Sequence, residues 1–205
     1  MLEIQVFTGG IAQTNGYCVV TPSAVLAVDA PEGMARWLRE QGVTVSHLLL
    51  THQHFDHCQD AAEIQREHGA EILAFAAFSR ELTLEFLISS AGRSFSIEPF
   101  VVNEVLEGRS EVAVGGINWN LAHVPGHSLD SITFYYREEN LLFAGDVLFA
   151  GSIGRTDFPG GSLSMLLQGL KEHVLSLPED TIVLPGHGPE TTVGHERADN
   201  PYLDI

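Results

Sequence analysis

The stretch THQHFDH at residues 51–57 constrains this chain most, because it places three histidines and one aspartate within seven positions. It follows directly on the apolar run VSHLLL, which is typical of a buried strand. His52 and His54 are two residues apart, so in an extended loop both side chains can converge on one metal ion. Asp56 and His57 follow at once and can face a second ion beside it. A true metal site then requires further His or Asp residues at the ends of other strands.

Three such residues follow in the sequence. His127 lies in VPGHS, Asp146 in FAGD and His187 in LPGHG, and each comes after an expected strand. The small residues beside them let the backbone turn sharply and aim a side chain inward. Neutral imidazole and carboxylate are ligands that a zinc-like ion prefers. These seven residues fit two ions that share one carboxylate.

The order of the expected elements predicts a layered α/β fold. Short runs rich in Val and Ile, separated by turn signals, predict strands. Helices are predicted where apolar residues recur at helical spacing, as for Met34, Trp37 and Leu38, and where Ser162 can cap the chain. The predicted strands are 3–7, 17–20, 24–30, 45–50, 71–75, 131–136, 141–144 and 181–184, the helices are 31–41, 60–68 and 162–177, and a hairpin covers 111–124 with its turn at Gly115-Gly116. Residues 79–108 show no clear pattern.

Strands and helices occur twice in similar order, which predicts two sheets sandwiched between helices. The 205 residues suit one domain, residues 1–205, with a substantial core. Ten Lys and Arg stand against 27 Asp and Glu, and the net charge of -17 disfavours nucleic-acid binding. No run approaches the ~18 apolar residues of a membrane helix. The start MLEIQVFTGG shows no secretion signal, and Cys18 and Cys58 alone make no disulfide framework, so we expect a cytoplasmic protein.

The set THQHFDH, GHS, GD and GHG resembles the metallo-β-lactamase superfamily, over nearly the whole chain. The resemblance implies an αββα sandwich of two mixed β-sheets flanked by helices, with the site at one edge. It also implies that His52, His54 and His127 hold a first metal ion, that Asp56, His57 and His187 hold a second, and that Asp146 bridges the two.

Within the superfamily, GSIGRTDFPGGS at residues 151–162 and the ending NPYL look like short, single-domain glyoxalase II-like hydrolases. The reaction so implied is hydrolysis of an acyl-thioester, such as a hydroxyacyl-glutathione, by a hydroxide that bridges two divalent ions. Asp56 and Asp146 are ligands first and can also orient or accept the proton. Zinc is the expected metal, and iron and manganese accept the same ligands.

The same residues leave some alternative functions open and disfavour others. Persulfide dioxygenases share the GRTDF element and hold one iron through residues that match His52, His127 and Asp146. A lactonase would direct the same hydroxide at an oxygen ester. A nuclease is disfavoured by the acidic charge, and a binding module without catalysis is disfavoured because all seven ligands are present. True β-lactamases of this fold lack the aspartate bridge and the histidine after the motif aspartate, so antibiotic hydrolysis is not expected.

The sequence says less about how the thiol part of the substrate is recognised. Two-domain glyoxalase II enzymes hold the glutathione carboxylates with basic residues of a C-terminal helical extension, and the sequence to Ile205 shows none. Recognition would then fall to Arg residues of the core or to a neighbouring subunit, and the sequence does not predict an oligomeric state. Arg155 is expected to form a structural ion pair with Asp157. Cys58 is expected to be a buried, inert thiol, and His123 is the histidine outside the motifs that best fits a supporting role.

Overall fold

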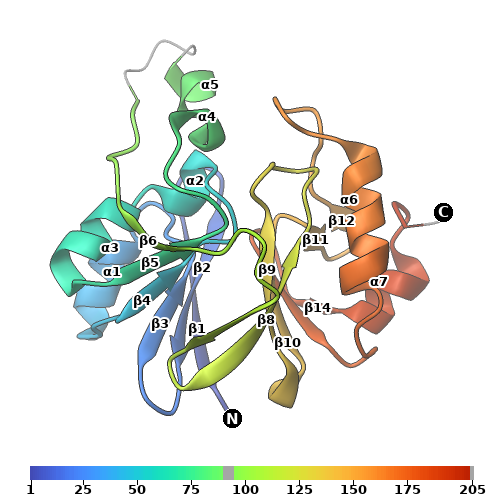
Figure 1. Ribbon diagram of the computed structural model, residues 1–205, viewed down its shortest axis with the longest axis horizontal. Coiled ribbons are helices and arrows are strands. Elements are labelled where there is room, and N and C mark those ends of the chain that lie inside the picture. Colours follow the sequence, from blue (N-terminus) through green and yellow to red (C-terminus); the bar gives the residue numbers. More distant parts are fainter. Residues whose placement is uncertain (90–94, 204–205) are drawn as a thin grey trace.

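The computed structural model describes residues 1–89 and 95–203. Two six-stranded sheets face each other, and helices cover the outer face of each, which gives four layers in the order αββα (Figure 1). This arrangement confirms the predicted fold class. We propose that residues 1–205 form one domain, because side chains from both sheets pack in one shared core between them.

The first sheet has the strand order β1-β2-β3-β4-β5-β6. Its first three strands are antiparallel neighbours, whereas β3 to β6 run parallel. A parallel neighbour requires a crossover, and helices α1 and α3 provide two of them. The strands are β1 Glu3–Gly9, β2 Thr14–Val20, β3 Val25–Val28, β4 His47–Leu49, β5 Glu71–Ala74 and β6 Val102–Val105.

The second sheet has the strand order β14-β13-β10-β9-β8-β7. Only β10 and β13 are parallel among these neighbours, so this sheet is mixed as well. A small separate hairpin, β11 with β12, lies beyond the end of β10. The strands are β7 Glu111–Val114, β8 Ile117–His123, β9 Ile132–Tyr136, β10 Leu141–Gly145, β11 Leu148–Phe149, β12 Ser152–Ile153, β13 Ile182–Pro185 and β14 Thr191–Thr192.

Aromatic side chains fill the space between the sheets. Trp119, Phe134 and Phe143 come from the second sheet and are fully buried. Tyr17 of the first sheet packs edge-on against Phe143, with 5.2 Å between ring centroids. On the outer faces, α1 Met34–Gln41 and α3 Ala61–His68 cover the first sheet, and α6 Leu163–Gly169 and α7 Val193–Asp199 cover the second (Figure 1). These two sheets form the scaffold on which the site is built.

Helix boundaries agree with the sequence prediction at α3 and differ at the other two helices. Helix α1 begins at Met34 rather than near residue 31, because Gly33 has a φ of 95°, which no helix can continue. The hydroxyl of Ser162 accepts a hydrogen bond from the Met165 N–H, as predicted for a cap. The predicted helix 162–177 is α only as far as Gly169, and a π-helical turn over Leu170–Val174 follows.

The hairpin at residues 111–124 is confirmed. Gly115 and Gly116 both have positive φ, 67° and 76°, which suits a two-residue turn whose central residues are left-handed.

Several short elements were not predicted from the sequence. They are α2 Phe55–Cys58, α4 Arg80–Thr83, α5 Glu85–Ser89, the 3₁₀ turn Arg137–Glu139, α7 and the short strands β6, β11, β12 and β14. Residues 79–108, which show no pattern in sequence, contribute α4, α5 and β6, and Figure 1 shows α4 and α5 standing above the first sheet. None of the helices in the described residues is long and apolar enough to cross a membrane.

Candidate metal centre

The structure brings all seven predicted ligand residues together at one edge of the sandwich. His52 and His54 lie in the loop after β4, and Asp56 and His57 lie in the short helix α2 rather than in an extended loop. The others follow strands of the second sheet: His127 lies between β8 and β9, Asp146 follows β10, and His187 follows β13. Because the parallel strands β10 and β13 end at the same edge, Asp146 and His187 meet there.

His52, His54 and His127 form a first triad. One ring nitrogen from each lies within 4.8 Å of the other two, which is close enough for one ion to bind all three. The ring centroids of His54 and His127 are 4.5 Å apart, and those of His52 and His54 are 4.6 Å apart. All three side chains are buried.

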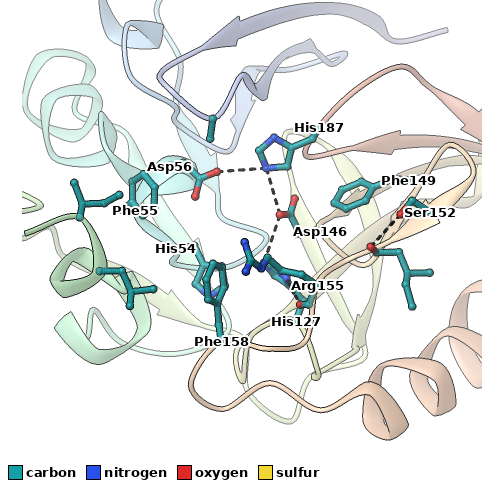
Figure 2. A pocket seen from close by; sticks show the side chains of 14 residues that line it. His54, Phe55, Asp56, His127, Asp146, Phe149, Ser152, Arg155, Phe158 and His187 are labelled. Atoms are coloured by element: carbon teal, nitrogen blue, oxygen red, sulfur yellow. Dashed lines mark hydrogen bonds and ion pairs between the residues drawn. The ribbon is translucent and has the colours of Figure 1, made fainter. Parts of the chain in front are cut away.

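Asp56, His57 and His187 form a second triad with the same 4.8 Å limit. Asp146 lies between the triads. Its Oδ2 is 3.4 Å from Nε2 of His127 and 3.3 Å from Nε2 of His187 (Figure 2). Its Oδ1 is 3.2 Å from Nε2 of His57. The side chain of His187 is 27% exposed, whereas that of His57 is fully buried, so the second triad is the side that a substrate can reach.

Unpartnered polar atoms test whether this cluster fits metal ions. In the described part of the chain, Nε2 of His57, Nε2 of His127 and Oδ1 of Asp146 are buried without a hydrogen-bond partner. Such atoms are costly to bury, yet these three converge on one place. A Cβ added at Gly186 would lie 2.2 Å from Oδ1 of Asp146, so the glycine also keeps this space open. The donor atoms and the open space fit divalent cations.

Asp29 orients His57 of the second triad and holds Thr51, which directly precedes His52 of the first. Its carboxylate accepts hydrogen bonds from the Thr51 N–H and hydroxyl, both at 2.8 Å, and lies 2.8 Å from Nδ1 of His57. A carboxylate can only accept here, so Nδ1 of His57 carries the proton and Nε2 is left to bind a metal. Asp29 itself has a φ of 57°, a conformation that aspartate tolerates better than most residues.

Two further contacts fix ligands of the cluster. Nδ1 of His127 donates to the carbonyl oxygen of Arg155 at 2.8 Å, which again directs Nε2 inward. The hydroxyl of Thr14 donates to Oδ2 of Asp56 at 2.8 Å. A ligand side chain held by a hydrogen bond in this way loses rotational freedom before the metal binds.

Asp130 joins the two loops that carry the first triad. Its Oδ2 accepts from the backbone N–H of Gln53 at 3.0 Å, and its Oδ1 accepts from the hydroxyl of Ser128 at 2.5 Å. Gln53 lies between His52 and His54, and Ser128 directly follows His127. Burial raises the pKa of Asp130 to about 6. This contact between the sheets is not predicted by the sequence, since a lone Asp in SLDS carries no motif signal.

The loop that carries His187 is held by the β1–β2 hairpin. The side-chain amide of Asn15 donates to the carbonyl oxygens of Pro185 and Gly188, and the hydroxyl of Tyr17 donates to that of Pro185 at 2.7 Å. The sequence does not predict this role for Asn15 and Tyr17. Their role becomes visible because residues some 170 positions apart lie side by side.

Burial and charge act differently on the two triads. Burial lowers the pKa of His52 well below its usual value and lowers that of His54 to about 3, so both rings are neutral, the form that binds metal. Burial also disfavours a charged His57, but the carboxylates of Asp146, Asp56 and Asp29 outweigh it and raise its pKa well above the usual range. The second triad therefore favours positive charge, which a divalent cation supplies.

Residues outside the cluster match their predicted roles. The Cys58 thiol is fully buried, and burial raises its pKa well above the usual value. The ring of His123 stacks on Phe75, and its Nε2 donates to the carbonyl oxygen of Leu129 at 2.8 Å, so it supports the loop of His127. Arg155 forms a two-point ion pair with Asp157, with both N–O distances 2.7 Å.

A cavity of about 500 Å³ opens onto the cluster. Figure 2 shows Asp56, His187, Asp146 and His127 along its wall, with Phe55 on one side and Phe149 on the other.

The comparison with protein families agrees with this geometry. A family model described as the metallo-beta-lactamase superfamily matches residues 20–187. The chain belongs to the metallo-β-lactamase superfamily, and its hydrolase relatives indicate an enzyme.

Curated relatives match along most of their length. The probable metallo-hydrolase YqgX of Bacillus subtilis is 35% identical, over 95% of this chain and 94% of its own. The hydroxyacylglutathione hydrolase GloC of Haemophilus influenzae is 35% identical, over 84% of this chain and 82% of its own.

Two solved structures superpose closely. The B3 metallo-beta-lactamase BLEG-1 has a TM-score of 0.90 and 32% identity, covering 99% of this chain and all of its own. TTHA1623, solved in a di-iron-bound form, has a TM-score of 0.85 and 32% identity, covering 97% of this chain and all of its own.

Proposed function

We propose that this protein is a metal-dependent hydrolase that cleaves acyl-thioesters and binds two divalent ions. The observation that carries the proposal is the convergence of the buried, unpartnered atoms of His57, His127 and Asp146 beside an open cavity. The thioester class is supported by the 35% identical relative named as a hydroxyacylglutathione hydrolase. Zinc is the proposed metal, and the di-iron form of TTHA1623 supports iron as the alternative.

In this proposal His52, His54 and His127 hold the first ion, Asp56, His57 and His187 hold the second, and Asp146 contributes to both. When bound, divalent ions lower the pKa of a water molecule and polarise a carbonyl group.

The protein's own residues then perform the remaining tasks. Asp29 keeps the proton of His57 on Nδ1, and the Arg155 carbonyl does the same for His127, so the ligand nitrogens stay available. The carboxylate of Asp56, anchored by the Thr14 hydroxyl, lies on the more exposed side, where it can orient the attacking water and accept its proton. Water adds to the thioester carbonyl carbon, the C–S bond breaks, and the thiol leaves with a proton.

The test pairs metal content with activity on protein purified without a metal-binding tag. Elemental analysis should give about two ions per chain, and the same preparation should hydrolyse lactoyl-glutathione. His187→Ala should lose the second ion and most activity. His195→Ala, an exposed histidine outside the cluster, should change neither.

Three outcomes would contradict the proposal. One iron per chain with oxygen uptake on a persulfide and no hydrolysis would favour the dioxygenase. A preference for oxygen esters would favour a lactonase. Hydrolysis of a β-lactam in place of thioesters would favour the activity named for BLEG-1.

A further inference from the structure

The cavity beside the metal cluster is lined mainly by apolar side chains; outside the cluster its polar lining residues are Ser152 and Arg155. Its wall includes aromatic and aliphatic side chains from α2, α5, the β11–β12 hairpin and the loop that follows it. These are Phe55, Leu87, Ile88, Phe149, Ile153 and Phe158. Figure 2 shows Phe55 on one side of the cluster, Phe149 on the opposite side and Phe158 beside His54. A group bound in this cavity therefore contacts hydrocarbon beside the cluster.

Cationic side chains are scarce at this cavity. Among the lining residues that the structure describes, Arg155 is the one cation. Its guanidinium is already paired with both carboxylate oxygens of Asp157, at 2.7 Å each, and its carbon atom lies 4.1 Å from the centroid of the Phe158 ring. Asp157, two residues away in the same loop, offsets the positive charge of this guanidinium and takes up two of its N–H groups. Residues 90–94, with Arg93, lie outside the described part of the chain.

A glutathione tail carries two carboxylates, and the described wall of the cavity offers neither of them a cation without a partner. An apolar acyl chain, in contrast, would remove six apolar side chains from water as it entered. The net charge of -17 further disfavours recognition through the glutathione carboxylates, because it repels anionic groups at long range.

We propose that the site selects thioesters by an apolar acyl chain bound in this cavity, and not by the carboxylates of a glutathione carrier. The inference rests on the proposed thioester hydrolase function and names its substrate class. The acyl chain lies along Phe55, Leu87 and Ile88 and the aromatic rings opposite them, and its carbonyl reaches the second triad. The thiol carrier contributes little to recognition.

The test separates acyl chain from carrier. N-acetylcysteamine thioesters with acyl chains of two to ten carbons keep the thiol part constant and uncharged, and glutathione thioesters of the same acids form the matched series. For the metal-loaded enzyme, kcat/KM should rise about fourfold per added methylene until the cavity is filled, as expected for burial of a CH₂ group. The two carriers should differ by less than about threefold at equal chain length, because neither carrier is recognised.

Variants of the wall provide the second readout. Leu87→Ser should lower kcat/KM about tenfold for the eight-carbon thioester and much less for the acetyl thioester, because the long chain loses the larger apolar contact. Leu163→Ser is the matched control, since this leucine is exposed on α6 and does not line the cavity. Arg155→Gln should leave the ratio between the two carriers unchanged.

A flat response to chain length, or a glutathione series that is faster by more than tenfold, would overturn the inference while leaving thioester hydrolysis intact. A tenfold loss of kcat/KM in Arg155→Gln on glutathione thioesters, but not on N-acetylcysteamine thioesters, would also overturn the inference. If no thioester of either series is cleaved, the proposed function itself fails.

Discussion

Replacement of Asp130 by alanine tests the idea that a contact between the two sheets prepares the first metal triad. The carboxylate accepts from the Gln53 N–H at 3.0 Å and from the Ser128 hydroxyl at 2.5 Å, and it is 2% exposed. Asp130→Ala removes both acceptors and leaves the N–H of Gln53 buried without a partner. The loop that carries His54 and the loop that carries His127 would then no longer be joined through one side chain.

The structure sets the size of the effect. A buried donor left without an acceptor costs ~1–3 kcal/mol, and the Ser128 hydroxyl can rotate to another acceptor more easily than a backbone N–H can. We therefore expect the free energy of unfolding of the metal-free protein to fall by about 2–4 kcal/mol. Removal of a residue that supports the metal ligands lowers metal affinity by about tenfold to hundredfold. For Asp130→Ala we expect a loss of about tenfold, because Asp130 contacts the loops that carry the ligands and not the imidazole rings. Asp130→Asn keeps one acceptor oxygen, so it should lose less stability and less metal affinity than Asp130→Ala.

Urea unfolding of the chelated protein measures the first quantity, and competition with a chromogenic chelator measures the second. The matched control is Asp60→Ala. Asp60 also accepts from two backbone N–H groups, those of Gly33 at 2.9 Å and Ala35 at 3.0 Å, but these begin helix α1 and do not belong to a ligand loop. The control should lose stability and keep its metal affinity. If Asp130→Ala binds both ions as tightly as the wild type does, the anchoring argument is wrong.

Four further outcomes are expected. Gly186→Ala should lower metal affinity, measured by the same chelator competition, because the new Cβ would lie 2.2 Å from Oδ1 of Asp146; unchanged affinity would show that the space is not needed. Burial lowers the pKa of His68, whose Nδ1 accepts from the Val45 N–H at 3.3 Å, so its contribution to stability is present above the usual histidine pKa and is lost as pH falls. His68→Asn, which keeps an acceptor at all pH values, should thus flatten the decline in unfolding free energy between pH 7 and pH 5, and an unchanged slope would refute this role. Cys58 should resist a thiol-specific colorimetric reagent until the protein is unfolded, since its thiol is buried and its raised pKa keeps it protonated; labelling of the native protein at this residue would contradict that. Removal of metal with a chelator should lower the midpoint of thermal unfolding, by the equivalent of about 3 kcal/mol when the metal was present at a hundredfold excess over its Kd, and a midpoint that does not move would argue against ions bound only by the folded state.

Local signals in the sequence predicted much of the fold. Alternating apolar runs identified most strands, and Gly115-Gly116 identified the hairpin turn, because strand and turn preferences depend on neighbouring residues. The seven ligand-type residues were predicted for the same reason: each lies in a short motif at the end of a strand. Because these strands end at the same edge of the sandwich, the side chains that follow them lie close together.

The sequence was less informative where a residue's role depends on a distant partner. Residues 79–108 have no regular pattern, and α5 from this region supplies Leu87 and Ile88 to the cavity. Helix α2 is a single turn, too short for helical periodicity to reveal, although it carries Asp56 and His57. The start of α1 was misjudged because the positive φ of Gly33 is set by its surroundings.

The sequence by itself therefore determined the class of fold and the chemical identity of the donor atoms, since both follow from local composition and order. Only the tertiary structure decided which nitrogen of His57 and of His127 faces the cluster, because Asp29 and the Arg155 carbonyl lie 28 residues from them in sequence. It also decided the character of the cavity, since side chains from α2, α5 and the β11–β12 region meet there only after the sheets have packed. Hydrogen bonds and buried contacts act through space over a few ångströms, and no spacing along the chain encodes which distant residues will share them.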